Sequence, residues 1–222
     1  MTEVVLDTET TGISIREGHR IVEIGCIELE NFVPTKKIFH YYLNPERKVS
    51  ENAFKIHGYS DEFLSDKKKF SEIAEEFLEF IKGKKIIIHN AEFDIGHINN
   101  ELGIINKNKL KMENVIDTLD IARNKFPGSS LSLDALCKRF RIDNSKRKNH
   151  TALIDCDLLS KVYINLLDQR EPTLNFADDK TDLVSNYNNK QTKYSKKIVG
   201  ITKEESVAHS IFLKEKLKKN FF

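Results

Sequence analysis

Residues 1–18 read MTEVVLDTETTGISIREG, and the acids in this stretch decide how the fold and the chemistry are interpreted. Apolar β-formers lead directly into Asp7 and Glu9, so the sequence predicts a strand that ends in two carboxylates. Side chains alternate across a strand, which places Asp7 and Glu9 on one side and Thr8 on the other. Two carboxylates at one place repel each other, and a hard divalent cation would relieve that cost. The structural alternative is a simple cap on the turn into Gly12, and this motif alone favours that alternative.

Two later segments add acids in comparable settings. Residues 84–99, KKIIIHNAEFDIGHIN, place Asp94 near a helix start after an apolar strand, where the helix dipole alone would also favour an Asp. Residues 147–163, RKNHTALIDCDLLSKVY, place His150 before a helix and Asp155 on it, although a lone His in such a place is more often structural. Four carboxylates and one imidazole together suit phosphoryl chemistry with two Mg²⁺ or Mn²⁺ ions. The imidazole titrates near neutral pH, so His150 is the candidate general base.

The hydrophobic pattern predicts a mixed α/β fold. Five segments are rich in β-formers and bounded by turn-forming or charged residues, namely residues 3–7, 20–29, 37–43, 85–89 and 114–118. Four segments show helical spacing, namely residues 71–82 with Ser71 as N-cap, 93–102, 132–140 and 151–167. Short links favour antiparallel pairing of the first three strands, and helical links favour parallel crossovers to the last two. We therefore expect an α/β fold with a mixed five-stranded sheet flanked by helices.

Composition restricts the class of protein. Of the 222 residues, 39% are hydrophobic and 32% charged, which is typical of a globular chain rather than a disordered one. No window approaches the roughly 20 apolar residues of a membrane span. Three cysteines without a CxxC pair, and no basic and apolar leader, predict a cytoplasmic protein without disulfides or a membrane segment.

The character of the sequence changes after Gln169. The following residues, up to 200, are rich in Asn, Asp and Lys and lack a sustained period, which is typical of a flexible linker. Residues 201–222 regain a helical pattern, with Thr202 and Glu205 as an expected capping box. A short amphipathic helix beyond a linker has no core of its own, so we expect it to bind a partner.

Three motifs together resemble those of the DEDDh branch of 3′–5′ exonucleases. They are DTETTG at residues 7–12, HNAEFD at residues 89–94 and the HxxxxD spacing of residues 150–155. The resemblance covers about residues 4–167 and implies a ribonuclease-H-like fold. It also implies metal-dependent hydrolysis of the 3′-terminal phosphodiester of single-stranded or frayed DNA. A mismatched end unpairs more easily, and only an unpaired end would reach such a site.

The resemblance assigns a role to each motif residue. It implies that Asp7, Glu9 and Asp155 hold the tighter of two Mg²⁺ or Mn²⁺ ions. Asp94 would help to hold the second ion. His150 would take the proton from the attacking water.

Other positions resemble those that contact the terminal nucleotide in the family. His57 in IHGYSDE matches a substrate-contacting position, and its alternative is a turn histidine beside Gly58. Asn52 stands where an acidic residue is usual, although its amide can still hydrogen-bond a sugar hydroxyl. Phe93 is a candidate for stacking on a base, but a core role is at least as consistent with its position. The expected substrate-binding set is Asp7, Glu9, Thr10, Asn52, His57 and Asp155.

The tail resembles that of family members that act with a replicative polymerase. Residues 171–176, EPTLNF, are similar to a peptide that binds the sliding clamp, with Leu174 and Phe176 entering apolar pockets. Glu171 stands where Gln is commoner, which implies weak binding. The terminal helix resembles the segment that tethers such nucleases to the polymerase subunit. The expected organisation is an exonuclease domain, a clamp-binding peptide, a linker and a polymerase-binding helix, at residues 1–170, 171–176, 177–200 and 201–222.

Two alternatives to a proofreading enzyme stay open at this point. One is an exonuclease of the same fold that trims RNA ends or acts in repair. The other is a non-catalytic adaptor that links a clamp to a polymerase, against which the complete acidic set argues.

Overall fold

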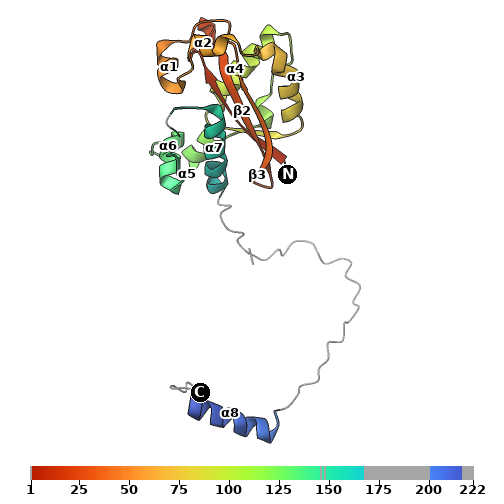
Figure 1. Ribbon diagram of the computed structural model, residues 1–222, viewed down its shortest axis with the longest axis vertical. Helices are drawn as coiled ribbons and strands as arrows, with labels where there is room; N and C mark the ends of the chain where they lie inside the picture. The colour runs from red at the N-terminus through yellow and green to blue at the C-terminus, as the bar shows by residue number, and fades with distance from the viewer. Residues whose placement is uncertain (1, 146, 148, 168–200, 217–222) are drawn as a thin grey trace, which may run out of the picture. The chain divides into compact units, whose positions relative to one another are not determined.

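The structure of the chain is a computed structural model that describes residues 2–145, 147, 149–167 and 201–216. It divides into two compact units, Met1–Thr173 and Leu174–Phe222, and each is described by itself. The first unit is built on a five-stranded sheet in the order β3-β2-β1-β4-β5 (Figure 1). Its strands are β1 (Thr2–Thr10), β2 (Ile21–Glu30), β3 (Val33–Tyr42), β4 (Lys85–Ile88) and β5 (Val115–Asp117).

The strand pairing confirms the expected mixed sheet. β1 pairs antiparallel with β2 and parallel with β4, β2 pairs antiparallel with β3, and β4 pairs parallel with β5. The predicted end of β1 at Asp7 is wrong, because Asp7, Thr8 and Glu9 all continue the pairing with β2. The sequence pattern places Thr118 in the fifth strand, but this residue begins a helix instead. The first carboxylates therefore stand within a paired strand, which fixes their directions.

Helices cover both faces of the sheet (Figure 1). On one face, α3 (Phe70–Ile81) and α4 (Ala91–Ile104) form a core with Val4 and Leu6 of β1. On the other face, three helices pack around Val5, namely α5 (Thr118–Lys125), α6 (Leu133–Phe140) and α7 (Ala152–Leu166). Alternation along β1 thus sends Asp7 and Glu9 toward the face of α7, and Thr8 toward the face of α4.

Several short elements are absent from the sequence prediction. They are α1 (Glu51–His57), α2 (Asp61–Ser65), α5 and two 3₁₀ helices, Ile15–Glu17 and Met112–Asn114. Phe54, Ile56 and Phe63 of α1 and α2 are exposed, so these helices show no apolar stripe facing a core. α1 nevertheless has a clear N-cap, since Ser50 accepts a hydrogen bond from the Ala53 N–H.

The start of α3 differs from the prediction. Ser71 is not its N-cap, because the helix begins at Phe70 and is capped at Lys69. Phe70 is buried in the core, and the Glu72 carboxylate accepts the Lys69 N–H at 2.7 Å. Burial and this hydrogen bond together extend the helix toward its N-terminus. α4 likewise begins two residues before the predicted Phe93.

The second unit contains α8 (Lys203–Lys216). The expected capping box is confirmed: the Thr202 hydroxyl accepts the Glu205 N–H at 3.2 Å, and the Glu205 carboxylate accepts the Thr202 N–H at 2.9 Å. Val207, Ile211 and Phe212 are exposed on this helix. The predicted clamp-binding peptide and linker lie outside the described residues. Among the helices that the structure describes, none has the length and apolar character of a membrane span.

Candidate active site

The predicted acids gather at one edge of the sheet. β1 and β4 are parallel, so their carboxyl ends meet at the same edge, where α/β proteins commonly bind ligands. Asp7 and Glu9 stand near the end of β1, and Asp94 lies in the first turn of α4, just after β4. Asp155 comes from the first turn of α7, on the face toward which Asp7 projects.

Gly25 allows α7 to approach that edge closely. It pairs with Asp7 in the sheet, and a Cβ on it would lie 2.8 Å from the carbonyl carbon of Ala152. The Cys156 thiol also donates to the Gly25 carbonyl at 3.2 Å. The missing side chain therefore lets the start of α7 bring Asp155 close enough to Asp7 for the two charges to interact.

Glu9, His150 and Asp155 form a group that could hold a cation. Each offers one ligand atom, and these atoms all lie within 4.8 Å of one another. His150 Nδ1 is 3.6 Å from Asp155 Oδ2. Asp7 and Asp94 are not part of this group, but they interact electrostatically with it and with each other. The structure thus brings all five predicted catalytic residues to one place.

Burial and mutual repulsion raise the pKa values of three of these acids. Burial raises the pKa of Asp7 well above its usual range, and the charges of Asp94 and Glu9 add to the rise. Burial, followed by the charge of Asp155, raises the pKa of Glu9 to about 8. Burial raises the pKa of Asp94 to about 7, although hydrogen bonds from Thr8 oppose the rise. Acids that resist ionisation in this way gain from a bound cation, so the donor set fits divalent metal ions.

Hydrogen bonds fix the position of Asp94. Its Oδ1 accepts the Thr8 N–H at 3.0 Å and the Thr8 hydroxyl at 2.7 Å. Thr8 therefore lies on the opposite face from Asp7, as expected, but it does not point away from the site, because it holds Asp94. Asp117 accepts the N–H groups of Asn90 and Ala91 at 3.0 and 2.9 Å and so anchors the start of α4. Sequence reasoning missed Asp117, although an Asp directly before a helix is an N-cap signal.

Arg147 is a second residue that sequence reasoning missed. Its Nε and Nη2 donate to the two carboxylate oxygens of Asp155, each at 2.6 Å. Its Nη1 donates to Asp134 at 2.7 Å, and its Nη2 lies 2.9 Å from His150 Nδ1. Burial and the Arg147 charge lower the pKa of His150, which keeps the imidazole neutral and able to accept a proton. The guanidinium thus supplies positive charge to Asp155 and hydrogen-bonds the candidate base.

Four of the six predicted substrate-binding residues line a cavity of about 470 Å³. Thr10, Asn52 and His57 contribute to its wall together with Glu9 and Phe93. Phe93 is only half-buried, so its side chain is available to a ligand in this cavity. Asp7 and Asp155 belong to the adjoining acidic cluster rather than to the cavity wall. The site therefore has a metal-binding side and a ligand-binding side that meet at Glu9.

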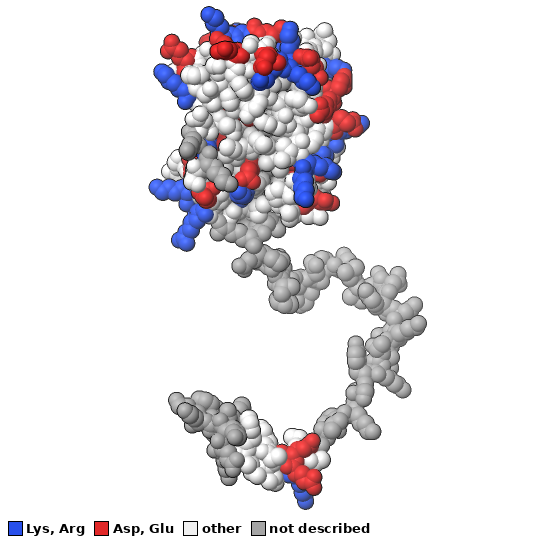
Figure 2. Space-filling model, viewed as in Figure 1, with Lys and Arg blue, Asp and Glu red and all other residues white. Residues whose placement is uncertain are grey.

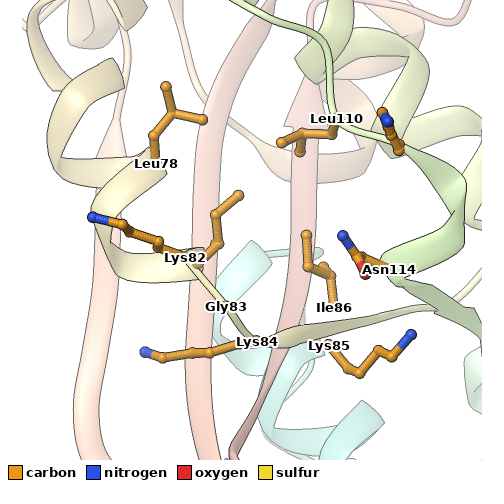
Figure 3. Close-up of a pocket in the computed structure, with 10 residues that line it drawn as sticks. Leu78, Lys82, Gly83, Lys84, Lys85, Ile86, Leu110 and Asn114 are labelled. Carbon is orange, nitrogen blue, oxygen red and sulfur yellow. The ribbon is translucent and has the colours of Figure 1, made fainter.

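A further cavity lies at the opposite end of β4 (Figure 3). Its volume is about 310 Å³, and several lysines surround it. Lys82 pairs with Glu79, Lys84 with Glu28, and Lys85 donates to a backbone carbonyl. Lys84 and Lys85 extend in opposite directions in Figure 3, so these charges do not converge on one ligand. On the face visible in Figure 2, acidic and basic side chains are likewise mixed around a broad uncharged area.

Comparison with known proteins defines the class. The chain matches the exonuclease family of the ribonuclease T type over residues 4–163. Its fold is that of the nuclease domain of 3′hExo, described as a DEDDh family member, with a TM-score of 0.66 at 16% identity over 76% of this chain and 92% of that one. The chain therefore belongs to the DEDDh exonuclease family: it is a 3′–5′ exonuclease with a ribonuclease-H-like fold, and this family depends on divalent metals.

Curated relatives specify the kind of exonuclease. The chain is 48% identical over 222 residues to the DNA polymerase III subunit epsilon of Rickettsia felis, covering 97% of both chains. It is 47% identical over 169 residues to the subunit epsilon of Escherichia coli (strain K12), covering 73% of this chain and 70% of the relative. By this similarity the chain acts as a proofreading 3′–5′ exonuclease of the epsilon-subunit kind. The finding favours proofreading over an RNA-trimming or repair enzyme and decides against a non-catalytic adaptor.

Proposed function

We propose that the five motif residues form a two-metal site for hydrolysis of the 3′-terminal phosphodiester of single-stranded or frayed DNA. Asp7, Glu9 and Asp155 hold one Mg²⁺ or Mn²⁺ ion, and Asp94 helps to hold the second. When bound, such ions supply charge that neutralises the scissile phosphate and lowers the pKa of an attacking water. The product is a nucleoside 5′-monophosphate.

The observation that carries this proposal is the crowding of acids at one edge of the sheet. Glu9 and Asp155 lie within 4.8 Å of each other and of His150, and burial raises the pKa of Glu9 to about 8. Burying such a group of acids without a ligand is costly, and a bound cation would offset that cost. Oxygen-rich donor sets suit Mg²⁺ and Mn²⁺.

His150 is the general base of the proposed reaction. Its lowered pKa keeps the ring neutral at pH 7, so one ring nitrogen can receive the proton of the attacking water. Nδ1 accepts a hydrogen bond from Arg147 in this structure, and the proton of the neutral ring then resides on Nε2. Arg147 must therefore withdraw from Nδ1, or the ring must exchange its proton, before His150 acts.

The cavity beside Glu9 receives the terminal nucleotide. Asn52 and Thr10 offer hydrogen-bonding groups to the sugar, and Phe93 offers a ring face to the base. His57, which lines the same cavity, also contacts the nucleotide. Paired DNA holds its terminal base in the helix, so an end that frays enters more readily, and a mismatch frays most.

The partners follow from the relatives and the tail. We assign residues 201–222 to binding of the DNA polymerase III alpha subunit, with Val207, Ile211 and Phe212 as an apolar contact surface on α8. Residues 171–176 bind the sliding clamp, and residues 177–200 link the two functions. A tether of this kind raises the local concentration of the nuclease near the polymerase without a strong contact of its own. Such a complex acts in the cytoplasm.

The first test is an exonuclease assay with matched 5′-labelled single strands of DNA and RNA in Mg²⁺. We expect stepwise shortening of DNA from its 3′ end, and its loss in Asp7→Asn. The control Asp157→Asn changes a half-exposed acid of α7 that pairs with Lys161, so it should leave cleavage intact. Faster cleavage of RNA than of DNA would overturn the assigned substrate, and cleavage by Asp7→Asn would overturn the assigned site.

A further inference from the structure

We propose that Glu23 is a positioning residue that holds the Tyr59–His57 pair against the start of α7. In this role it directs the Nε2–H of His57 toward the terminal nucleotide. The inference rests on the proposed function, in which His57 contacts that nucleotide. It adds a residue that stands outside the three motifs and outside every predicted site.

Glu23 is an acid within an apolar strand. It pairs with Glu9 in the sheet and is fully buried. Its Oε2 accepts the Tyr59 hydroxyl at 2.7 Å and the Ala152 N–H at 2.9 Å, while Oε1 lies 2.7 Å from His40 Nε2. A buried carboxylate next to other acids is costly even with its hydrogen bonds made. An acid in this place therefore needs a reason beyond packing.

Tyr59 holds His57 in two ways. The Tyr59 N–H donates to His57 Nδ1 at 3.0 Å, and the two rings stack with centroids 4.8 Å apart. Because Nδ1 accepts, the neutral ring carries its proton on Nε2. Burial lowers the pKa of His57 and favours the neutral ring, although a backbone hydrogen bond with Thr10 and the charge of Glu23 oppose the change. Tyr59 thereby selects the tautomer that makes Nε2 a donor.

The Nε2–H of His57 is the unsatisfied end of this chain of contacts. His57 is 2% exposed, and its Nε2 makes no hydrogen bond of normal geometry to the described residues, although the Thr10 backbone lies close enough to affect the pKa of the ring. It lines the 470 Å³ cavity together with Glu9, Thr10 and Asn52. A buried donor without a partner costs free energy, which a phosphate or sugar oxygen of a bound nucleotide would recover. The donor is therefore prepared for a ligand.

Glu23 also joins this ligand side to the catalytic side. The oxygen that accepts from Tyr59 accepts the Ala152 N–H, at the start of the helix that carries Asp155. A second link runs in parallel, because the His150 N–H donates to the Ile56 carbonyl at 3.1 Å. One carboxylate oxygen thus sets the distance between the donor for the nucleotide and the start of α7. Errors of about 1 Å in such distances can cost roughly a hundredfold in rate.

The test uses Tyr59→Phe, which removes the hydroxyl contact with Glu23 and keeps the aromatic ring. Its matched control is Tyr41→Phe, because the Tyr41 hydroxyl donates to Glu76 at 2.8 Å on the protein surface. Each variant loses one Tyr–Glu hydrogen bond, and only the first lies near the site. Glu23→Gln is the third variant, and it weakens the contacts with both Tyr59 and α7.

We expect Tyr59→Phe to raise KM for single-stranded DNA by about threefold to tenfold, the worth of one such hydrogen bond, while kcat changes less. Imidazole nitrogen NMR should show a single Nε2–H tautomer for His57 in the wild type. Tyr59→Phe keeps the backbone N–H that selects this tautomer, so the tautomer should persist, while the His57 resonances should shift or broaden because the contact of the ring pair with Glu23 is lost. Glu23→Gln should additionally lower kcat, because the start of α7 is released. Tyr41→Phe should match the wild type in KM and in the His57 spectrum.

The result that would overturn the proposal is a Tyr59→Phe variant that behaves like Tyr41→Phe in both KM and the His57 spectrum. If Glu23→Gln does not fold, Tyr59→Phe decides the question alone. Binding of thymidine 5′-monophosphate, measured by calorimetry, separates this proposal from the proposed function. Binding that is about threefold to tenfold weaker in Tyr59→Phe supports the positioning role even if the wild type fails to shorten DNA, and unchanged binding contradicts it.

Discussion

Replacing Gly25 by alanine should push the start of α7, which carries Asp155, away from the strand that carries Asp7 and Glu9. The added Cβ would meet the Ala152 carbonyl carbon at 2.8 Å and the Leu153 nitrogen at 3.0 Å, whereas ordinary contacts begin at 3.4 Å. Both neighbours are backbone atoms, so no side chain can turn aside. The start of α7, which carries Asp155, must then move by about 0.6 Å or more.

Two magnitudes follow from this displacement. Overpacking of this kind costs about 1–3 kcal/mol of unfolding free energy. For a chain of this size that corresponds to a Tm lower by about 2–12 °C. A displacement approaching 1 Å between catalytic groups costs up to about a hundredfold in rate, so we expect Gly25→Ala to lose about tenfold to a hundredfold in kcat.

The assay compares thermal unfolding and the initial rate of shortening of a 5′-labelled single strand. Gly103→Ala is the matched control, because nothing lies within 4 Å of a Cβ at this exposed position in α4. Alanine is favoured over glycine in helices by up to about 1 kcal/mol, so this variant should keep its activity and its Tm or gain stability. Gly25→Ala with the Tm and rate of Gly103→Ala would refute the argument that this glycine sets the approach of α7.

Three further outcomes follow from the charges of the site. The apparent affinity for Mn²⁺ should rise between pH 6 and 8, by up to roughly tenfold per pH unit for each proton displaced, because burial raises the pKa of Glu9 to about 8 and that of Asp94 to about 7. Calorimetry in buffers of different ionisation enthalpy measures the protons released on binding. Binding without proton release would contradict this prediction. A carboxyl whose pKa is raised in the folded state contributes its full stability below its ordinary pKa and loses that contribution as pH rises through the raised pKa. The metal-free protein should therefore become less stable between about pH 4.5 and 8. Thermal unfolding of Glu9→Gln should show a weaker dependence on pH than the wild type. Arg147→Gln should bind Mn²⁺ several-fold more tightly, because a positive charge no longer pairs with Asp155. The control Lys161→Gln should match the wild type in the same titration. Weaker binding in Arg147→Gln would contradict this prediction and show that the guanidinium orients Asp155 for the ion.

Much of the sheet could be predicted because its signals are local. Alternating and continuous apolar runs identified all five strands, and link lengths gave their directions. α7 was predicted in full because Thr151 caps it and Cys156, Leu159 and Tyr163 repeat at helical spacing on its buried side. The sequence pattern did not predict α1 and α2, because these helices are short and expose apolar side chains such as Phe54.

The acids of the site were expected together because their three motifs resemble those of one family, and a strand or helix then fixes where each one points. Glu23, Asp117 and Arg147 could not be predicted, since their contacts join segments that lie far apart in the sequence or depend on a loop. The Glu23–Ala152 hydrogen bond, for example, spans 129 positions. A signal for Glu23 existed nonetheless. It is an acid inside IVEIGCI, and an acid in a strand this apolar is costly to bury without a specific role.

The most direct test of the central claim is the number of Mn²⁺ ions that the protein binds with thymidine 5′-monophosphate present, measured by electron paramagnetic resonance at pH 8. The account predicts two ions per chain in the wild type. It predicts that Asp94→Asn lowers the affinity for one ion and that Asp155→Asn lowers the affinity for the other. Asp157→Asn should retain both ions. Absence of saturable Mn²⁺ binding, or binding unchanged by Asp94→Asn and Asp155→Asn, would contradict the claim that these carboxylates form a two-metal exonuclease site.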